Sequence, residues 1–285
     1  MNRIVAFVFL FTVAFSSCNK GIDVVTESVP ALNIKDVAYG SDAAQKMDIY
    51  LPSGRASSST KVLVFIHGGS WSGGDKNDFG EAITAILPKL TNYALVNINY
   101  RLANSTNRFP TQMTDIQSAL DFVKSKGTEY KVDANKVGLI GASAGAHLAL
   151  LQAYKFNTDG RIKAVVDIFG PTDLNDLYFN HPFPTASQPV LVNFLGTTPT
   201  VNAALYQQAS PINFITPQSV PTQIFHGNLD IVNPIGQSLA LKAKLQASNV
   251  KVEMITYIGE GHGWIGSNLL DTYNKAVTFI TQNVK

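Results

Sequence analysis

The motif Gly141–Gly145, with Ser143 at its centre, constrains this chain more than any other feature, because an apolar run precedes it and another follows. Val137–Ile140 predicts a buried strand, and the run after the motif has helical spacing. A sharp turn between the two would hold Ser143 in a strained conformation, with a helix N-terminus behind its hydroxyl. Any Cβ at Gly141 or Gly145 would collide with the neighbouring strand or helix. The motif predicts an exposed, reactive serine; the alternative is an ordinary glycine-rich connection.

The composition fits one large α/β domain with a substantial core. The chain has 285 residues, 45% of them hydrophobic, and its net charge is +2 with 15% of residues charged. A domain of this length can bury most of its apolar side chains. No basic stripe or run of Lys and Arg is present, so we expect no nucleic-acid partner.

The first eighteen residues resemble an export signal. Arg3 precedes an apolar run over residues 4–15 that is too short to span a bilayer, and small residues lead to Cys18, the single cysteine. The pattern is similar to a bacterial lipoprotein signal, which would be cleaved before Cys18 and would leave that residue acylated. The alternative is an ordinary secretory signal cleaved nearby. Both predict an exported protein, periplasmic or at the cell surface, with residues 19–34 as a tether.

Strand-like and helix-like runs alternate along residues 35–285. The expected strands are 36–39, 46–51, 61–66, 94–98, 137–140, 164–169, 222–225 and 250–257. The expected helices, besides the run after the serine motif, are 79–91, 110–126, 235–248 and 269–283. Such alternation predicts a mostly parallel, doubly wound α/β sheet with helices on both faces.

Two segments interrupt the alternation. Residues 52–60 are polar and short, and we expect them to form a hairpin loop between the strands on either side. Residues 170–218 are rich in proline and aromatic residues, and we interpret them as an insertion that covers the end of the sheet at which Ser143 lies. The alternative for this insertion is a solvated excursion with a few short helices.

A serine hydroxyl needs a base to accept its proton and an acid to orient that base. The strand–serine–helix turn belongs to a fold in which these groups follow in the order Ser, Asp, His. Asp230 comes just after a late strand, and His262 lies in a glycine-rich loop before the last helix. We therefore expect Ser143, Asp230 and His262 to form a catalytic triad. Glu260 is a less well placed alternative to Asp230.

The turn after residues 61–66 is expected to bind the oxyanion that forms when the serine attacks a carbonyl. Its glycines let backbone N–H groups approach a substrate closely. The expected donors are Ala144 together with Gly69 and Ser70, or with Gly68 and Gly69.

The other histidines have structural interpretations. His67 is expected to hold the oxyanion turn, His147 to be a satisfied core residue, and His226 to brace the loop that carries Asp230. No pair has the spacing of a zinc site, so we expect no metal and no cofactor. Arg101 and Asp115 are expected to form a buried structural ion pair.

Five further residues are candidates for contact with a substrate. Trp71 and Trp264 flank the expected site in the sequence and could present flat faces to a sugar or an aryl group; the alternative is that both pack in the core. The other three, Phe179, His181 and Phe183, lie in the insertion. They would contact the substrate if the insertion covers the site.

Taken together, seven segments of the chain resemble the α/β-hydrolase superfamily, in particular hormone-sensitive-lipase-like esterases, and are most similar to secreted bacterial esterases of the bifunctional feruloyl and acetylxylan type. They are HGGSW, NYRLA, FPTQMTDIQSAL, GASAGAHLAL, FGPTDL, HGNLDIVNP and GEGHGW, and the resemblance covers about residues 35–283. It implies an α/β-hydrolase fold, the same triad, and an oxyanion hole made by the HGGS turn and Ala144. One departure is Ser70, where many relatives have a third glycine.

The expected activity is therefore hydrolysis of carboxylic esters, with acetyl or feruloyl groups on xylan fragments as the substrate. Three alternatives stay open. The first is a general short-chain carboxylesterase, and the second is a serine peptidase similar to dipeptidyl peptidases, although these carry a large extra domain. The third is a binding protein without activity, against which the complete triad argues.

Overall fold

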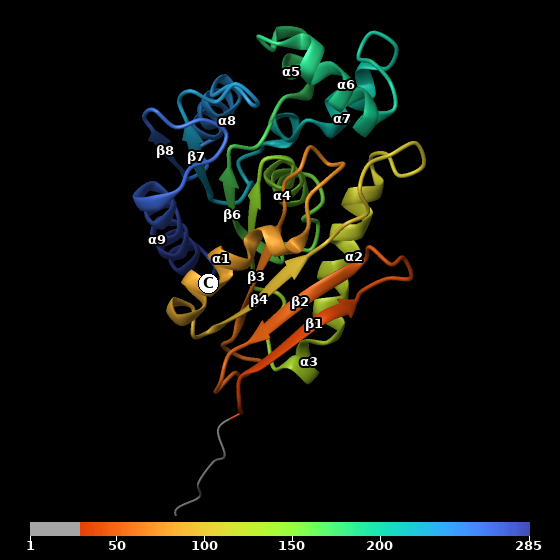
Figure 1. Ribbon diagram of the computed structural model, residues 1–285. Coiled ribbons are helices and arrows are strands. Elements are labelled where there is room, and N and C mark those ends of the chain that lie inside the picture. The colour runs from red at the N-terminus through yellow and green to blue at the C-terminus, as the bar shows by residue number, and fades with distance from the viewer. Residues whose placement is uncertain (1–28) are drawn as a thin grey trace, which may run out of the picture.

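The computed structural model describes residues 29–285. The expected signal, Cys18 and the first part of the expected tether lie outside the described residues. The described chain forms an eight-stranded sheet in the order β1-β2-β4-β3-β5-β6-β7-β8 (Figure 1). The strands are β1 Leu32–Ala38, β2 Lys46–Leu51, β3 Lys61–Ile66, β4 Tyr93–Ile98, β5 Val137–Ala142, β6 Ile162–Ile168, β7 Thr222–Gly227 and β8 Val252–Tyr257.

The pairing confirms a mostly parallel sheet and corrects one connection. From β4 to β8 all neighbouring strands are parallel, whereas β1 and β2 are antiparallel to their neighbours. Residues 52–60 do not form a hairpin loop, because β2 pairs with β4 and β4 lies between β2 and β3. The expected tether, residues 19–34, also extends too far along the chain, because β1 begins at Leu32.

Helices cover both faces of the sheet. They are α1 Gly80–Ile86, α2 Thr111–Ser125, α3 Gly127–Tyr130, α4 Ala144–Tyr154, α5 Leu174–Asn180, α6 Pro184–Leu195, α7 Ala203–Ala209, α8 Gly236–Ala247 and α9 Gly266–Asn283, with 3-10 helices η1 Lys76–Phe79, η2 Leu87–Lys89 and η3 Pro211–Phe214. The helix expected at 79–91 is thus split into η1, α1 and η2. One apolar core joins the sheet to α2, α4 and α8 through Met113, Leu148 and Leu241. A second joins it to α1 and α9 through Ile83 and Phe279.

The inserted segment, residues 170–218, is largely helical. Figure 1 shows its helices α5, α6 and α7 together at the upper end of the molecule. Asp173 caps α5 by accepting from the backbone N–H groups of Asn175 and Asp176. Pro184 occupies the first turn of α6, where its missing N–H is not needed, and Gly196 ends that helix with a left-handed residue at φ 80°. Two of the seven prolines, Pro184 and Pro211, therefore begin helices, Pro189 lies inside α6, and the other four lie outside the helices.

Within residues 29–285, no helix combines the length and the apolar character that crossing a membrane requires.

Candidate active site

Ser143 sits in the sharp turn between β5 and α4. Its φ is 53°, an unusual value for a residue with a side chain, and its N–H donates to the carbonyl of Ile168 over 2.8 Å. A Cβ at Gly141 would lie 2.3 Å from the carbonyl oxygen of Gly145, and one at Gly145 would lie 2.0 Å from that of Ile66. The two glycines therefore permit the close approach that puts the strained serine at the end of the sheet.

His262 joins Ser143 to Asp230. The Nε2 atom of His262 lies 2.8 Å from Oγ of Ser143, and its Nδ1 lies 2.7 Å from Oδ2 of Asp230. An ionised carboxylate only accepts hydrogen bonds, so Nδ1 carries the imidazole proton and Nε2 accepts from the serine hydroxyl. The structure thus brings together three residues separated by 87 and 32 positions in the sequence (230 − 143 and 262 − 230).

The Asp230 carboxylate is held ionised in a buried position. Its Oδ1 accepts backbone N–H groups from Val232, at 2.8 Å, and Asn233, at 2.9 Å. Burial raises its pKa, but hydrogen bonds from His226 and His262 lower it more, so the net pKa lies well below the usual value for aspartate. Asp230 therefore stays negatively charged throughout the neutral pH range.

His226 braces the Asp230 loop, as the sequence predicts. Its Nδ1 lies 2.7 Å from Oγ of Ser238, and its Nε2 lies 2.8 Å from the carbonyl of Asn233 and 3.2 Å from Oδ2 of Asp230. Both neighbours of Nε2 are acceptors, so the proton is on Nε2 and Ser238 donates to Nδ1. The ring is fully buried, and its contacts with Asn233 and Asp230 hold the loop in place.

His147 is a core residue, also as predicted. Trp71 Nε1–H donates to its Nδ1 over 3.1 Å, and its own Nε2–H donates to the carbonyl of Ala209 over 2.7 Å. Burial lowers the pKa of His147 to about 4, so the ring stays neutral. The ring ties the oxyanion turn to the inserted segment, and neither of its nitrogens bonds to the Ser143 side chain.

Two residues of the site were missed by the sequence reasoning. Phe169 has a φ of 47°, and its ring centroid lies 4.5 Å from that of His262. Asn233 donates through Nδ2 to the Phe169 carbonyl over 3.0 Å, so it links the strand end that holds the phenyl ring to the Asp230 loop. Asn233 lies in the HGNLDIVNP segment quoted above, but only the three-dimensional contact reveals its role.

The oxyanion turn lies against the serine. A Cβ at Gly68 would lie 2.9 Å from the Ala142 carbonyl and 3.2 Å from Cβ of Ser143, so only glycine fits there without a shift. Gly69 has a φ of 102° and Ser70 one of 52°. His67 holds the turn, since its Nδ1 lies 2.8 Å from the Gly68 carbonyl.

A cavity of about 340 Å³ opens beside Ser143 and His262. Ser70, Trp71 and Ala144 are part of its lining together with Ser143, whereas Gly68 and Gly69 are not. The remaining walls come from α5, α6 and the β7–α8 loop and are mostly apolar. The described lining contains no Asp, Glu, Lys or Arg.

The aromatic candidates divide into those in the cavity wall and those outside it. Trp71 lines the cavity while its ring stacks on Phe194 at 4.4 Å. Trp264 fits the alternative of a packing residue: its Nε1–H donates to Thr272, its ring packs on Phe169 and Tyr257, and it is not part of the cavity lining.

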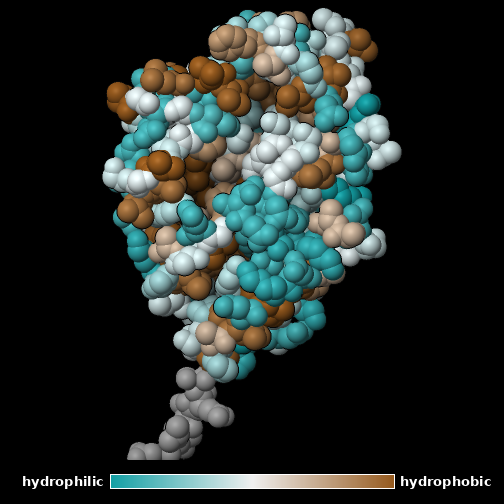
Figure 2. All heavy atoms as spheres, in the orientation of Figure 1, coloured by the Kyte–Doolittle hydropathy of each residue, from teal (hydrophilic) through white to brown (hydrophobic). Residues whose placement is uncertain are grey.

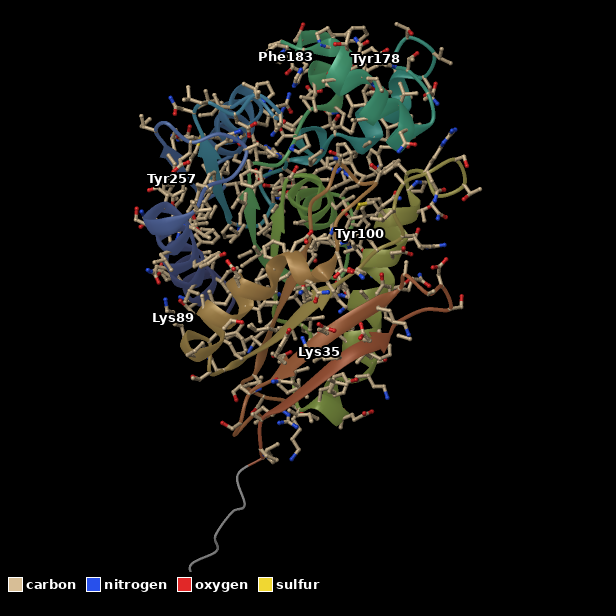
Figure 3. All side chains as sticks on the ribbon, viewed as in Figure 1. Lys35, Lys89, Tyr100, Tyr178, Phe183 and Tyr257 are labelled. Atoms are coloured by element: carbon tan, nitrogen blue, oxygen red, sulfur yellow. The ribbon has the colours of Figure 1, made fainter. Side chains whose placement is uncertain are left out.

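The insertion contributes two of its three candidates to the cavity. Phe183 lines it and stays about half exposed at the upper end of the molecule (Figure 3). His181 also lines it, but both ring nitrogens are engaged: Nδ1 accepts from the Phe183 N–H, and Nε2 donates to the Val232 carbonyl. Phe179 was a wrong candidate, because it is exposed and packs on Tyr178 outside the cavity lining.

The remaining polar candidates are structural. Arg101 pairs with the fully buried Asp115 over 2.6 Å, and Gln45 donates to the same carboxylate over 2.8 Å. Glu260 accepts from Asn268 over 2.7 Å, while the contact with His262 belongs to Asp230. In the described part of the chain, no group of three or more His, Cys, Asp or Glu residues could hold a metal ion.

Several curated proteins with similar sequences are named as esterases. Esterase LipC of Mycobacterium tuberculosis is 28% identical over 252 residues, which are 82% of this chain and 60% of that protein. The probable carboxylic ester hydrolase LipM of the same organism is 30% identical over 217 residues, 71% of this chain and 49% of that protein. The chain therefore spans 49–60% of the length of these two relatives.

Solved structures match most of the described fold. A truncated carbohydrate esterase from gut microbiota has a TM-score of 0.75 at 23% identity, over 90% of this chain and 97% of that chain. A bifunctional GH43-CE protein of Bacteroides eggerthii has a TM-score of 0.78 at 26% identity, over 89% of this chain and 35% of that chain. The BD-FAE family matches residues 47–245, which is more than half of the sequence. The protein is thus a member of the BD-FAE family and has the α/β-hydrolase fold.

Proposed function

We propose that the protein is a serine carboxylic-ester hydrolase. The observation that carries this proposal is the continuous line of hydrogen bonds from Ser143 Oγ through His262 to Asp230, with distances of 2.8 and 2.7 Å. The names of the similar proteins, esterases and a probable carboxylic ester hydrolase, support it. A binding protein without activity would have no need of this arrangement.

The geometry accounts for each step of ester hydrolysis. Ser143 attacks the ester carbonyl while Nε2 of His262 takes the hydroxyl proton. Asp230 keeps the proton on Nδ1 beforehand and stabilises the imidazolium that forms. His262 then protonates the leaving alcohol, and a water molecule repeats the sequence to release the acid.

The oxyanion hole is proposed to use the N–H groups of Ala144 and Ser70. Both residues line the cavity next to Ser143, and neither N–H donates to a protein acceptor among the described hydrogen bonds. Ala144 is also the first residue of α4, whose N-terminus favours negative charge. Gly68 and Gly69 then serve mainly to let the turn approach the serine.

The proposed substrates are feruloyl or acetyl esters of plant polysaccharide fragments such as xylan. Two structures with the same fold are named as a carbohydrate esterase and an acetyl ester-xyloside bifunctional hydrolase, which supports a carbohydrate ester. The cavity volume of about 340 Å³ and its mostly apolar wall favour a feruloyl group over acetyl, because an acetyl group would leave most of the space unfilled. The same apolar wall favours, as the second candidate, a general carboxylesterase without sugar preference.

Two measurements test the proposal. Ser143→Ala should lower hydrolysis of p-nitrophenyl acetate by about 10⁴-fold or more while the protein stays folded. Substantial remaining turnover would reject Ser143 as the nucleophile. Comparing methyl ferulate and acetylated xylan with simple p-nitrophenyl esters tests the substrate: poorer turnover of both would favour the general esterase.

Export and lipid attachment at Cys18 are proposed from the sequence pattern described above. Expression of the full chain with radiolabelled palmitate in a bacterial host should label the wild type and not Cys18→Ser. Labelling of neither protein, with the mature chain released into the periplasm, would favour an ordinary secretory signal.

A further inference from the structure

One polar side chain interrupts the apolar wall of the cavity. The face of α6 and its N-cap that lines the cavity consists of Phe183, Ala186, Ser187, Val190 and Leu191. Their spacing of three and four residues places them on one side of the helix. Ser187 is the single polar member of this face.

The Ser187 hydroxyl has no protein partner. Its Oγ is shielded from solvent and makes no hydrogen bond within residues 29–285. On helices, serine hydroxyls commonly bond to a backbone carbonyl of the preceding turn, which this one does not do. Burial of a hydroxyl without a partner lowers the stability of the folded state. The position therefore carries an energetic cost that packing does not explain.

The side-chain oxygen of Asn233, another residue of the lining, is also shielded and without a partner in the described part of the chain. Asn233, which is 3% exposed, donates through Nδ2 to the Phe169 carbonyl, and this bond fixes the orientation of its amide. Its Oδ1 has no hydrogen-bond partner among the described residues. Asn233 belongs to the β7–α8 loop, whereas Ser187 belongs to the insertion. Two residues of the lining, on separate elements, thus each have one shielded polar atom without a partner in residues 29–285, and only the Ser187 hydroxyl is free to turn.

We propose that Ser187 makes the cavity selective for a substrate group that carries a hydroxyl. This inference rests on the proposed ester hydrolysis at Ser143 and identifies the group that occupies the cavity. A neutral hydroxyl suits this serine because it can both donate to and accept from the Ser187 hydroxyl.

A charged group fits this cavity less well than a hydroxylated one. The described lining offers no Lys or Arg to a carboxylate and no Asp or Glu to an amine, and burial of an unpaired charge is costly. The chemical class is therefore an apolar chain or ring that bears a hydroxyl, such as a phenol. Turning Oγ of Ser187 toward it requires rotation about one bond between staggered positions.

The test compares matched esters in the wild type and in Ser187→Ala. The quantity measured is the ratio of kcat/KM for methyl 4-hydroxycinnamate to that for methyl cinnamate. We expect Ser187→Ala to lower this ratio by about three- to tenfold, the effect of one neutral hydrogen bond. Its melting temperature should equal or exceed that of the wild type, because the substitution removes an unsatisfied buried hydroxyl.

Thr185→Val is the matched control, since Thr185 is an exposed residue of α6 outside the cavity lining and loses the same hydroxyl. Its ratio should equal that of the wild type. An unchanged ratio in Ser187→Ala, or a lower melting temperature with equal losses on both esters, would overturn the inference.

If the wild type hydrolyses p-nitrophenyl acetate but neither cinnamate ester, the feruloyl proposal fails, and the same ratio is then measured with methyl 3-hydroxybutyrate and methyl butyrate. An unchanged ratio there overturns the inference, and a fall by the same factor supports it. Loss of p-nitrophenyl acetate hydrolysis in Ser143→Ala reports separately on the proposed function.

Discussion

Nε2 of His226 lies 3.2 Å from Oδ2 of Asp230. The same oxygen accepts the hydrogen bond from Nδ1 of His262 over 2.7 Å. One carboxylate is thus held between two imidazoles, of which only His262 reaches the serine. His226 is fixed in turn by Ser238, on the first turn of α8. The β7–α8 loop is therefore anchored to a helix at the point where it carries the acid.

Asp230→Asn should lower kcat by about 10⁴-fold, with little change in the fold. The amide of asparagine can donate a hydrogen bond, so His262 would tend to carry its proton on Nε2, where it cannot accept from Ser143. Burst kinetics with p-nitrophenyl acetate, together with circular dichroism, would measure both effects. A variant within tenfold of the wild type would show that Asp230 does not orient the base.

His226→Leu should cause a smaller loss, about ten- to hundredfold in kcat, because it removes one hydrogen bond to a charged group and puts an apolar side chain of similar size in its place. It also leaves the Asn233 carbonyl without its partner, so the melting temperature should fall. The loss of kcat in His226→Leu is therefore compared with the loss in Asp230→Asn. A loss as large as that of Asp230→Asn would mean that His226 does more than position the carboxylate.

Asp167, on β6, makes stability depend on pH. It is fully buried, its Oδ1 accepts from the Gly170 N–H over 2.7 Å, and burial raises its pKa to about 7. In the unfolded chain the same group ionises near pH 3.9. Between about pH 4 and pH 7 only the unfolded state releases the proton, so the free energy of unfolding falls as pH rises through this window and then levels off.

Asp167→Asn removes that ionisation and keeps an acceptor for Gly170. The variant should be more stable than the wild type by about 1–3 kcal/mol at pH 8, with the difference shrinking toward pH 4. Urea denaturation at both pH values measures this. A difference that is constant with pH would contradict the assignment of the raised pKa to Asp167.

The sequence predicted the parts of this fold that local patterns encode. Alternating runs predicted each strand to within a few residues, and the order Ser143, Asp230, His262 predicted which side chains meet. Strand neighbours are not encoded locally, so the connection over residues 52–60 was misread as a hairpin although β4 lies between its strands. Trp71 and Trp264 have similar sequence surroundings, and only tertiary packing places one in the cavity wall and the other in the core.

The insertion was harder to predict for a different reason. Proline usually ends helices, so a segment with seven prolines indicates a loop. Here Pro184 begins α6 and Pro211 begins η3, which are positions that tolerate proline. The contacts that build the cavity, such as the bond from His181 to the Val232 carbonyl, join residues 51 positions apart and leave no periodic signal.

The surface around the cavity mouth is apolar, which bears on the size of the substrate. Phe183, Ile231 and Val232 line the cavity, and each is more than half exposed. Figure 2 shows apolar residues gathered over the end of the molecule that α5 and α8 form, in contrast to the more hydrophilic surface over β1 and β2. An apolar substrate group that fills the cavity would therefore also contact this rim.

Val190→Trp should narrow the cavity, because Val190 lies on the α6 face of its wall. Added bulk in a packed site typically costs 1–3 kcal/mol, so kcat/KM for methyl ferulate should fall about tenfold or more relative to that for p-nitrophenyl acetate. Val201→Trp, at an exposed position of the same insertion outside the lining, adds the same bulk and should leave the ratio unchanged. If both esters lose activity equally in Val190→Trp, the acyl group does not enter this cavity, and the wall of α6 would then contact the leaving alcohol instead.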